Sequence, residues 1–359
     1  MKAFDPWSSK QIDNKKVFKE FGLKKFPEAW RKELNHYLFE RNIVIGHRDF
    51  EKVLNCVREK RPFINMTGIA SSGRLHLGHK AIIDLFMFFK NCGARNYFCV
   101  ADLEGYTSRA QVENLEQAKE LAVNNLAHVL AFGIEESEAY AQSNYKIRYY
   151  SFVFEISKKI TKNAFEATYG HVDLGKMSAA LLQYADILHA QLPEFEGKMP
   201  SITPIALDQD PHARITHDVA KRLHYDLELP SFLYISHQSG LLQGTKMSSS
   251  NPESAIFLDD MPEDLHVKVS NAFTGGRETA ALQRKLGGKP DICKVCELLR
   301  FHYPDTREVE RIMNECRKGT RLCGETKSFA IEFFTKFLKE HQKKAKDKEK
   351  SARRIVYGK

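Results

Sequence analysis

The chain has 359 residues, of which 42% are apolar and 28% charged, with a net charge of +9, so it can bury a large core in about two or three packed units. Its mean hydropathy is −0.44, no apolar run approaches the roughly 18 residues that span a bilayer, and its first residues lack an apolar signal core. These properties argue against the membrane, secreted and disordered classes and predict a soluble cytoplasmic protein whose seven cysteines are reduced.

The first 62 residues mix helix-like stretches with a short β-branched run at 42–45 and end in the breaker pair Arg61-Pro62. We interpret residues 1–62 as an N-terminal extension. A strand is predicted at 63–67, followed by a loop of small residues at 68–73 and an amphipathic helix at 78–90. This order is a β-loop-α unit.

Two histidines stand where this loop meets its helix. The segment 71–79 reads Ser-Ser-Gly-Arg-Leu-His-Leu-Gly-His and places His76 and His79 at the helix start. A helix N-terminus offers free N–H groups and a positive dipole end, so an anion such as a triphosphate can bind there, and Gly78 lets a nucleotide approach the backbone. Alone, this motif is about equally well explained by two capping histidines.

The α/β alternation continues along the chain. A buried strand is predicted at 96–101 and a helix at 114–132, where no glycine or proline interrupts the pattern. The chain then reads as mostly helical at about 145–200, and a strand returns at 202–207. We expect an α/β domain at 63–265 with a parallel sheet that a helical insertion, about 115–200, divides in two.

A second loop of hydroxyl side chains follows this sheet. Gly-Thr-Lys-Met-Ser-Ser-Ser at 244–250 surrounds Lys246 with donors suited to gripping β- and γ-phosphates. By itself, such a loop is more often a solvated turn. After Pro262 the pattern is helical, with glycine pairs at 275–276 and 287–288, which predicts an all-helical domain at 266–340.

Residues 341–359 form a predicted basic tail. Six of the nine excess positive charges lie at 336–354, where nine basic residues face three acidic ones. Such a segment suits binding to a phosphate backbone, although a lysine-rich terminus is about as often a solvated helix end.

Taken together, the segments at 76–79 and 246–250 resemble the two signature motifs of class I aminoacyl-tRNA synthetases. The segments 207–218, 274–279 and 322–327 are further similar to tryptophanyl-tRNA synthetases, the latter two to the C-terminal domain of the archaeal and eukaryotic enzymes. The resemblance implies a Rossmann-like catalytic domain, an anticodon-binding helical domain and a homodimer built by the insertion. It also implies activation of L-tryptophan with ATP and Mg²⁺, followed by transfer to tRNA(Trp).

The resemblance also assigns site residues. It implies catalytic roles toward the phosphates for His76, His79, Lys246, Ser248, Ser249 and Ser250. It implies ATP contacts for Gly68, Ser72, Gly78, Asp208 and Met247, with Asp208 on the ribose hydroxyls. It implies that Glu104 and Gln209 hold the tryptophan ammonium, although Glu104 and Asp208 also suit plain roles as a surface acid and a loop cap. Many family members have a second lysine where Ser249 stands.

The tryptophan pocket departs from the eukaryotic pattern. Eukaryotic family members bind the indole N–H with a tyrosine and a glutamine, but here Met66 and Cys99 stand at those places. Gln183 and Asp186 instead resemble the recognition helix of the bacterial enzymes. Being three residues apart, they share a helix face, and we expect Asp186 to accept the indole N–H. The alternative is a polar stripe on a solvated helix.

Four cysteines cluster in the helical domain. The spacing of Cys293, Cys316 and Cys323 resembles that of three thiolates that bind a [4Fe–4S] cluster in some family members, but Thr326 takes the fourth place. Cys296 offers a fourth sulfur for a cluster or for Zn²⁺. Free cysteines more often pack as small buried side chains, so no metal site is assigned.

Three other functions compete with tryptophan activation. Tyrosyl-tRNA synthetases share the signatures, but the glycine-rich run at 274–288 argues against them. A non-catalytic paralogue that only binds tRNA or a partner has no need for His76, His79 and Lys246. A small-molecule adenylyltransferase leaves the helical domain and the basic tail unexplained.

Overall fold

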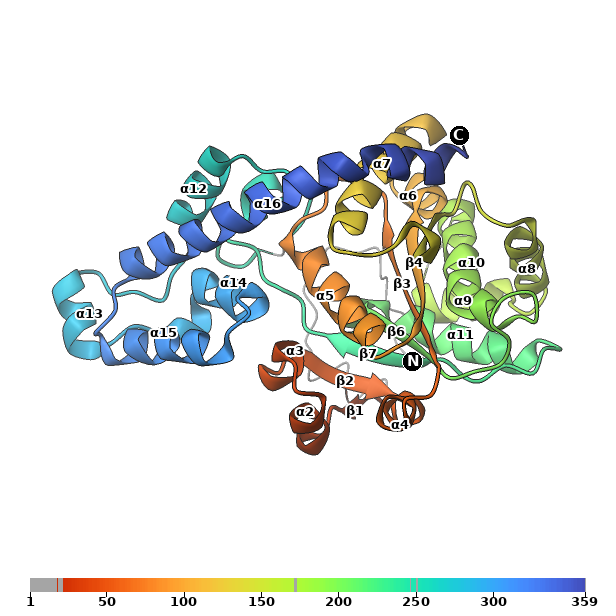
Figure 1. Cartoon of the computed structure of the whole chain (residues 1–359), viewed down its shortest axis with the longest axis horizontal. Helices are drawn as coiled ribbons and strands as arrows, with labels where there is room; N and C mark the ends of the chain where they lie inside the picture. The colour runs from red at the N-terminus through yellow and green to blue at the C-terminus, as the bar shows by residue number, and fades with distance from the viewer. Residues whose placement is uncertain (1–17, 19–21, 171–172, 246, 250, 359) are drawn as a thin grey trace.

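The computed structural model describes residues 18, 22–170, 173–245, 247–249 and 251–358. Lys246 and Ser250, both assigned to the second signature, lie outside the described residues. The described residues form a seven-stranded sheet covered by helices on both faces, together with a separate group of helices toward the C-terminus (Figure 1). Within the part of the chain that the structure describes, no helix combines the length and apolar character needed to cross a membrane.

The sheet is mixed, with strand order β1-β2-β7-β6-β3-β4-β5. Neighbours from β7 to β5 pair in parallel, whereas β1 and β2 run antiparallel to their neighbours. The predicted α/β class with a largely parallel sheet is confirmed. The strands are β1 (Lys24–Lys25), β2 (Val44–Arg48), β3 (Ile64–Ala70), β4 (Arg95–Ala101), β5 (Ala139–Ala141), β6 (Ser201–Ala206) and β7 (Ser231–Ile235).

The helices fill the connections between these strands and form the C-terminal part. The helices before β6 are α2 (Glu28–Leu34), α3 (Tyr37–Glu40), α4 (Glu51–Glu59), α5 (Leu77–Asn91), α6 (Asp102–Ser108), α7 (Leu115–Ala131), α8 (Ile147–Ser157), α9 (Lys162–Tyr169) and α10 (Leu174–Leu188). The later helices are α11 (Asp210–Arg222), α12 (Pro262–Asn271), α13 (Ala280–Leu286), α14 (Lys294–His302), α15 (Thr306–Lys318) and α16 (Cys323–Tyr357). Short 3₁₀ turns are η1 (Glu136–Glu138), η2 (His189–Gln191), η3 (Leu207–Gln209), η4 (Pro252–Ser254) and η5 (Pro290–Ile292).

Side chains alternate across the sheet. In β7, Leu233 and Ile235 pack into the cluster that includes α5, whereas Phe232 and Tyr234 pack toward α10 and α11. This period of two places apolar side chains on both faces, as expected for a sheet that is covered on both sides.

Two domain boundaries differ from the sequence-based ones. Residues 1–62 are not only an extension, because β1 and β2 join the sheet next to β7. The range 115–200 is not all helical insertion, because β5 lies within it and pairs with β4, so the helical part begins at α8. A strand of three residues is too short to produce a detectable alternation, which explains why the pattern missed it.

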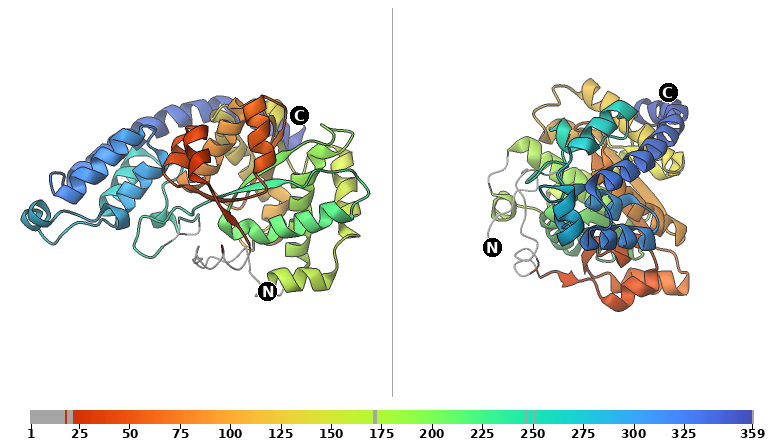
Figure 2. Two further views of the ribbon diagram at one scale, coloured as in Figure 1. Left: turned by 90° about the horizontal axis from the view of Figure 1, so that it is seen from below. Right: turned by 90° about the vertical axis from the view of Figure 1, so that its left-hand side faces the viewer.

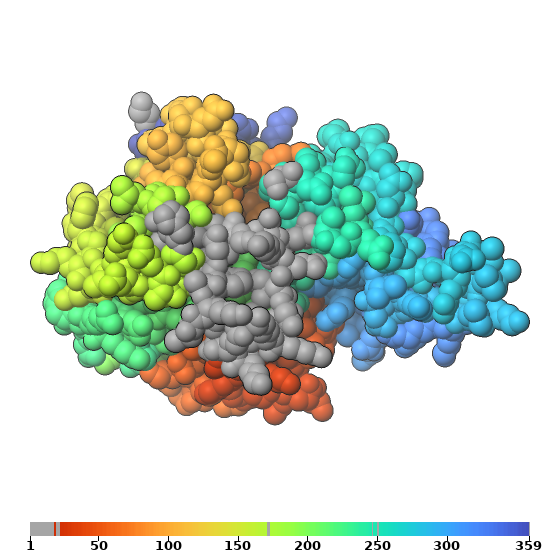
Figure 3. All heavy atoms as spheres, turned by 180° about the vertical axis from the view of Figure 1, so that it is seen from behind, coloured from red at the N-terminus to blue at the C-terminus, as the bar shows by residue number. Residues whose placement is uncertain are grey.

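The insertion helices α8 to α10 and the helices α13 to α15 lie at opposite ends of the molecule (Figures 2 and 3). Helix α16 has 35 residues and runs from the helical domain along α7, so no break separates the predicted domain from its basic tail (Figure 1). The tail is instead docked on the sheet domain. Arg353 pairs with Glu120 at 2.8 Å, and the Tyr357 hydroxyl donates to Glu116 at 2.6 Å.

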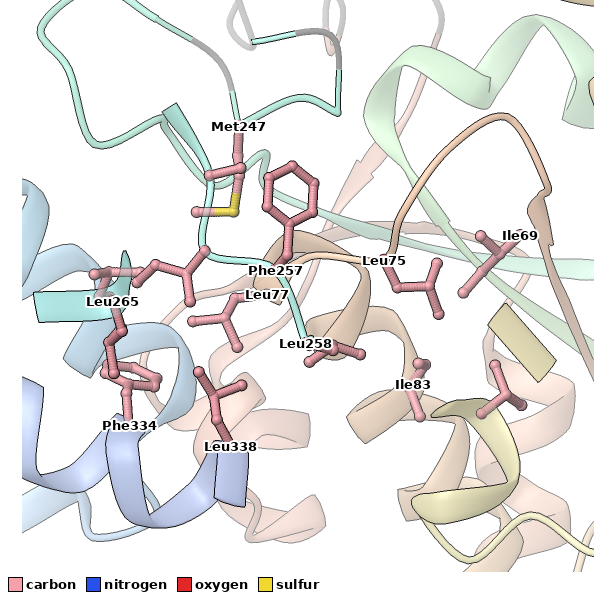
Figure 4. Close-up of a cluster of buried hydrophobic side chains, with 14 of the residues drawn as sticks. Ile69, Leu75, Leu77, Ile83, Met247, Phe257, Leu258, Leu265, Phe334 and Leu338 are labelled. Atoms are coloured by element: carbon pink, nitrogen blue, oxygen red, sulfur yellow. The ribbon is translucent and has the colours of Figure 1, made fainter. Parts of the chain in front are cut away.

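One hydrophobic cluster crosses both domains. It contains Leu77 and Val100 of the sheet domain and Leu298 of the helical domain, all buried. Phe334 and Leu338 of α16 pack into the same cluster (Figure 4). The two predicted domains therefore share part of a core.

Candidate functional site

The loops that follow the parallel strands meet at one edge of the sheet. The first signature segment follows β3, Glu104 follows β4, and Asp208 follows β6. Strand β3 pairs with β4 on one side and with β6 on the other. The chain passes from β3 to β4 in one direction along the sheet and from β6 to β7 in the other, so the strand order reverses between β3 and β6. In open parallel sheets, ligands bind in the crevice at such a switch point.

His76 and His79 cap α5 reciprocally. The Gly78 N–H donates to Nδ1 of His76, and the His76 N–H donates to Nδ1 of His79, each at 3.1 Å. Because both Nδ1 atoms accept hydrogen bonds, each neutral imidazole carries its proton on Nε2. Burial lowers the pKa of His79 to about 4, so at neutral pH His79 offers a donor and not a cation.

The glycine at 78 is required by this cap. A Cβ at Gly78 would lie 2.9 Å from the His76 ring and would displace it. Met247 lies nearby and is buried among Leu77 and Phe257, where its thioether packs in the apolar cluster (Figure 4). The Met247 side chain therefore anchors the second signature loop, and any contact of this residue with ATP would come from its main chain.

The two signature segments are in contact. The Ser249 hydroxyl donates to the carbonyl of Arg74 at 3.0 Å, and a Cβ at Gly73 would lie 2.9 Å from Cβ of Ser249. Ser248 forms an isolated bridge with Asn251 in the same loop. The fold thus brings together His76, His79 and the described serines of the second signature.

The other residues assigned to ATP lie on β3, on the turn after it, and on the turn after β6. Ser72 is partly buried in the turn after β3, where its N–H donates to Ala70. Gly68 passes close to β4, and a Cβ there would lie 3.0 Å from Cys99. Asp208 is 6% exposed and lies 3.4 Å from Nε2 of His237, which follows β7.

Asp186 lies at the centre of a buried polar network. Its Oδ1 accepts hydrogen bonds from the hydroxyls of Tyr140 at 2.7 Å and Tyr149 at 2.8 Å, and its Oδ2 accepts one from Gln142 at 2.7 Å. Burial raises the pKa of Asp186 to about 6, while these donors act in the opposite direction. A carboxylate offers about four acceptor positions, and the Cys99 thiol is a fourth donor to Asp186, so a ligand N–H would share or displace one of these donors.

The other residues assigned to tryptophan surround this network. Nε2 of Gln183 donates to Oε1 of Gln209 at 3.4 Å, and the backbone N–H of Glu104 donates to Gln142 at 2.9 Å. Burial raises the pKa of Glu104 to about 7; Asp186 also raises it and Arg109 opposes the shift. These hydrogen bonds link α10 to turn η3 and α6 to the turn after β5.

Several residues of the site were not predicted from the sequence. Tyr140, Gln142 and Tyr149 hold Asp186, and Nδ2 of Asn125 on α7 donates to the carbonyl of Gly73 at 3.1 Å. Tyr140 and Gln142 are two residues apart, which places both on one side of an extended chain. This spacing was the only feature of the sequence that could have indicated their shared role. Asn125 lies inside a regular helix, and nothing in its neighbourhood indicates a role.

The cysteines of the helical domain lie near one another and are mostly buried. The N–H of Cys296 donates to Sγ of Cys293 at 3.5 Å, and Sγ of Cys323 donates to Oε1 of Gln283 at 3.4 Å. Among the residues described, no three histidine, cysteine or acidic side chains are arranged to hold a metal ion.

Comparison with known proteins agrees with this geometry. The family of class I tRNA synthetases for W and Y matches residues 58–339. The tryptophan–tRNA ligase of Hyperthermus butylicus is 38% identical, covering 95% of this chain and 94% of the relative, and that of Methanocaldococcus jannaschii is 37% identical, covering 99% and 98%. The crystal structure of tryptophanyl-tRNA synthetase from Aeropyrum pernix is similar with a TM-score of 0.88 at 37% identity, covering 98% of each chain.

Proposed function

This chain belongs to the family of class I tRNA synthetases for W and Y, and we propose that it activates L-tryptophan with ATP and transfers the tryptophanyl group to tRNA(Trp). The observation that carries this proposal is the contact between the two signature segments at the edge of the sheet. There His76, His79 and Ser249 lie in two contacting segments, and a separate buried polar network surrounds Asp186.

In the first step, a carboxylate oxygen of tryptophan attacks the α-phosphorus of ATP. An O–P bond forms, the bond to the pyrophosphate oxygen breaks, and pyrophosphate leaves with the electron pair. An ionised carboxylate needs no strong base, so the barrier falls through positioning and through stabilisation of negative charge on the phosphates. We assign this stabilisation to the Nε2–H groups of His76 and His79, the serine hydroxyls of the second signature, and Lys246.

In the second step, a ribose hydroxyl at the tRNA terminus attacks the carbonyl carbon of the adenylate. As the ester bond forms, the bond between the carbonyl carbon and the phosphate oxygen breaks, AMP leaves with the electron pair, and the hydroxyl proton passes to an oxygen of its phosphate. We assign Asp208 to binding of the adenosine ribose, because a carboxylate can accept hydrogen bonds from both ribose hydroxyls. Nε2 of His237 lies 3.4 Å from Oδ1 of Asp208. We assign anticodon binding to the helical domain at 266–340 and place the reaction in the cytoplasm, where the seven thiols stay reduced.

We propose that Mg²⁺ enters with ATP as part of the substrate. The described donors around the first signature are imidazoles, hydroxyls and backbone groups, which suit phosphate oxygens better than a hard cation. The phosphates would then provide the metal's ligands.

Amino-acid-dependent exchange of pyrophosphate into ATP tests the proposed function. Only tryptophan, among the twenty amino acids, is expected to support rapid exchange, since the pocket has a buried acceptor for a polar ring N–H. Exchange with tyrosine in place of tryptophan would show that the chain is a tyrosine-specific member of the same family. Absence of exchange with every amino acid would overturn the proposed activity.

Tryptophan binding is expected to strengthen as the pH rises from 6 to 8. The pKa of Glu104 is about 7, and the ammonium group of tryptophan is held by the ionised carboxylate. Since the ionised fraction rises from roughly 0.1 to roughly 0.9 over this range, the dissociation constant for tryptophan should fall about ninefold. Fluorescence titration measures this dissociation constant. The Glu104→Gln variant should lose most of the pH dependence of tryptophan binding and keep only the contribution from ionisation of Asp186. A flat profile in the unchanged protein would contradict the role of Glu104.

We propose that the insertion forms the interface of a homodimer. The three most exposed large apolar side chains among the described residues are Leu174 at 82%, Ile147 at 80% and Phe154 at 74%, and all lie on α8 or α10. Ile147 and Phe154 are seven residues apart, so they share a face of α8. Exposed apolar groups of this kind mark protein interaction surfaces.

Placing an acid on this face should separate the two copies. In sedimentation analysis, Phe154→Asp is expected to shift the protein from dimer to monomer at micromolar concentration, because the buried charge would lack a partner. Val267→Asp is the matched control, since Val267 is 52% exposed on α12, away from the insertion. An unchanged dimer in the Phe154 variant, or a monomeric parent protein, would overturn this assignment.

A further inference from the structure

A short stretch after the second signature supports the start of α5. This bridging segment, residues 256–260, runs beside the first signature. The N–H of Leu258 donates to the carbonyl of Leu75 at 2.9 Å, and Phe257 forms an antiparallel bridge with His76. The backbone position of His76, and hence the direction of its imidazole, therefore depends on the bridging segment.

The bridging segment is also tied to the second signature. Oδ2 of Asp260 accepts from the N–H of Phe257 at 2.9 Å, which closes the end of the segment. The Arg74 guanidinium donates to Oδ1 of Asp260 at 3.3 Å, and the carbonyl of Arg74 accepts the Ser249 hydroxyl at 3.0 Å. A displacement of the bridging segment would therefore move groups of both signatures.

Helix α16 holds the bridging segment from the helical domain. The side-chain amide of Gln342 donates to the carbonyl of Leu258 at 3.1 Å and to that of Asp260 at 2.9 Å. Both acceptor residues are buried, and the two donated bonds use both amide protons. Phe334 and Leu338 lie two turns and one turn earlier on the same face of α16 and belong to the same buried cluster as Leu258 (Figure 4).

We propose that Gln342 is a positioning residue for the ATP site: by holding two carbonyls of the bridging segment, it sets the position of His76 and of the second signature loop. The proposal rests on the proposed function for its kinetic consequence. The network around Asp186 comes from residues on or next to β4, β5, α8 and α10, and the hydrogen bonds of its donors Tyr140, Gln142 and Tyr149 do not involve the bridging segment. Loss of Gln342 should therefore affect ATP and not tryptophan.

Two substitutions of Gln342 distinguish the effect of its hydrogen-bond donors from the effect of its side-chain volume. Gln342→Met keeps length but removes both donors, and it is expected to lower the turnover of tryptophan-dependent exchange, or to raise the KM for ATP, about tenfold, with the KM for tryptophan unchanged within about twofold. Gln342→Lys keeps N–H donors at similar reach and should recover most of the loss. Lys343→Met is the control, because Lys343 is the exposed neighbour on the same helix.

Amide hydrogen exchange provides a readout that does not depend on activity. In Gln342→Met, the amide of Leu258 should exchange at least about tenfold faster than in the parent, while amides of α4, which lies far from α16, should keep their protection. Unchanged protection at Leu258, or equal increases of KM for both substrates, would overturn the proposal. If the parent supports no exchange with tryptophan, the proposed function fails, but the protection of Leu258 still decides whether Gln342 holds the bridging segment.

Discussion

Replacing Lys246 by alanine is expected to slow tryptophanyl-adenylate formation by on the order of a hundredfold or more, the size of effect seen when one preorganised group that stabilises developing negative charge is lost. The described neighbours of Lys246 support this role. Met247 is buried against Leu77, and Ser249 contacts the first signature, so the chain is anchored directly after Lys246. Single-turnover measurement of adenylate formation isolates this step.

The substitution should leave tryptophan binding almost unchanged, because Lys246 acts on the phosphates. Lys246→Arg is the informative control, since it keeps the charge with a different geometry and should fall between the parent and the alanine variant. Adenylate formation at the parental rate in the alanine variant would refute the assignment of residues 244–250 to the phosphates.

Replacing Asp186 by alanine is expected to raise the KM for tryptophan by on the order of 10- to 100-fold, because the indole N–H would lose its buried acceptor at a cost of about 1–3 kcal/mol. Discrimination against phenylalanine should fall as well, since a site with a buried polar partner rejects analogues that lack the matching group. Steady-state exchange kinetics with both amino acids measures these effects.

The network around Asp186 requires a control for structure. Asp186→Ala also leaves Tyr140, Tyr149 and Gln142 without their acceptor, so the free energy of unfolding should fall too. Tyr149→Phe removes one of these donors but keeps the carboxylate, and it should destabilise the protein with a much smaller change in KM. If Asp186→Ala only lowers stability and keeps the parental KM, Asp186 is a structural residue and Gln183 becomes the candidate reader of the indole.

Secondary-structure elements could be predicted where the apolar pattern extends over many residues. Helix α5 and strand β4 were placed within one or two residues, because each has an apolar pattern that extends over most of its length. Strand β5 has three residues and owes its place in the sheet to pairing with β4, which no local pattern reveals. The docking of the basic tail was missed for a similar reason, since its partner Glu120 is distant in the sequence.

The sequence proposed residues of the candidate site but not the contacts that hold them. His76 and His79 were found from their spacing, but the reciprocal cap that determines their protonation is a property of the folded helix start. Asp186 was found by resemblance, whereas the groups that hold it come from β5 and α8 and meet only in three dimensions. Gln342 sits in a lysine-rich stretch that indicates a solvated surface, and only its two backbone acceptors show otherwise.

The apolar cluster that crosses both domains makes the protein one cooperative unit. Melting the helical domain alone would uncover Leu77 of the sheet domain, since Leu338 lies beside it in the shared cluster (Figure 4). Such partial unfolding therefore carries an added free-energy cost, and we expect intermediates with one domain melted to be scarcely populated. In calorimetry, the sheet domain and the helical domain should melt in a single transition, although their chain segments and helix content differ.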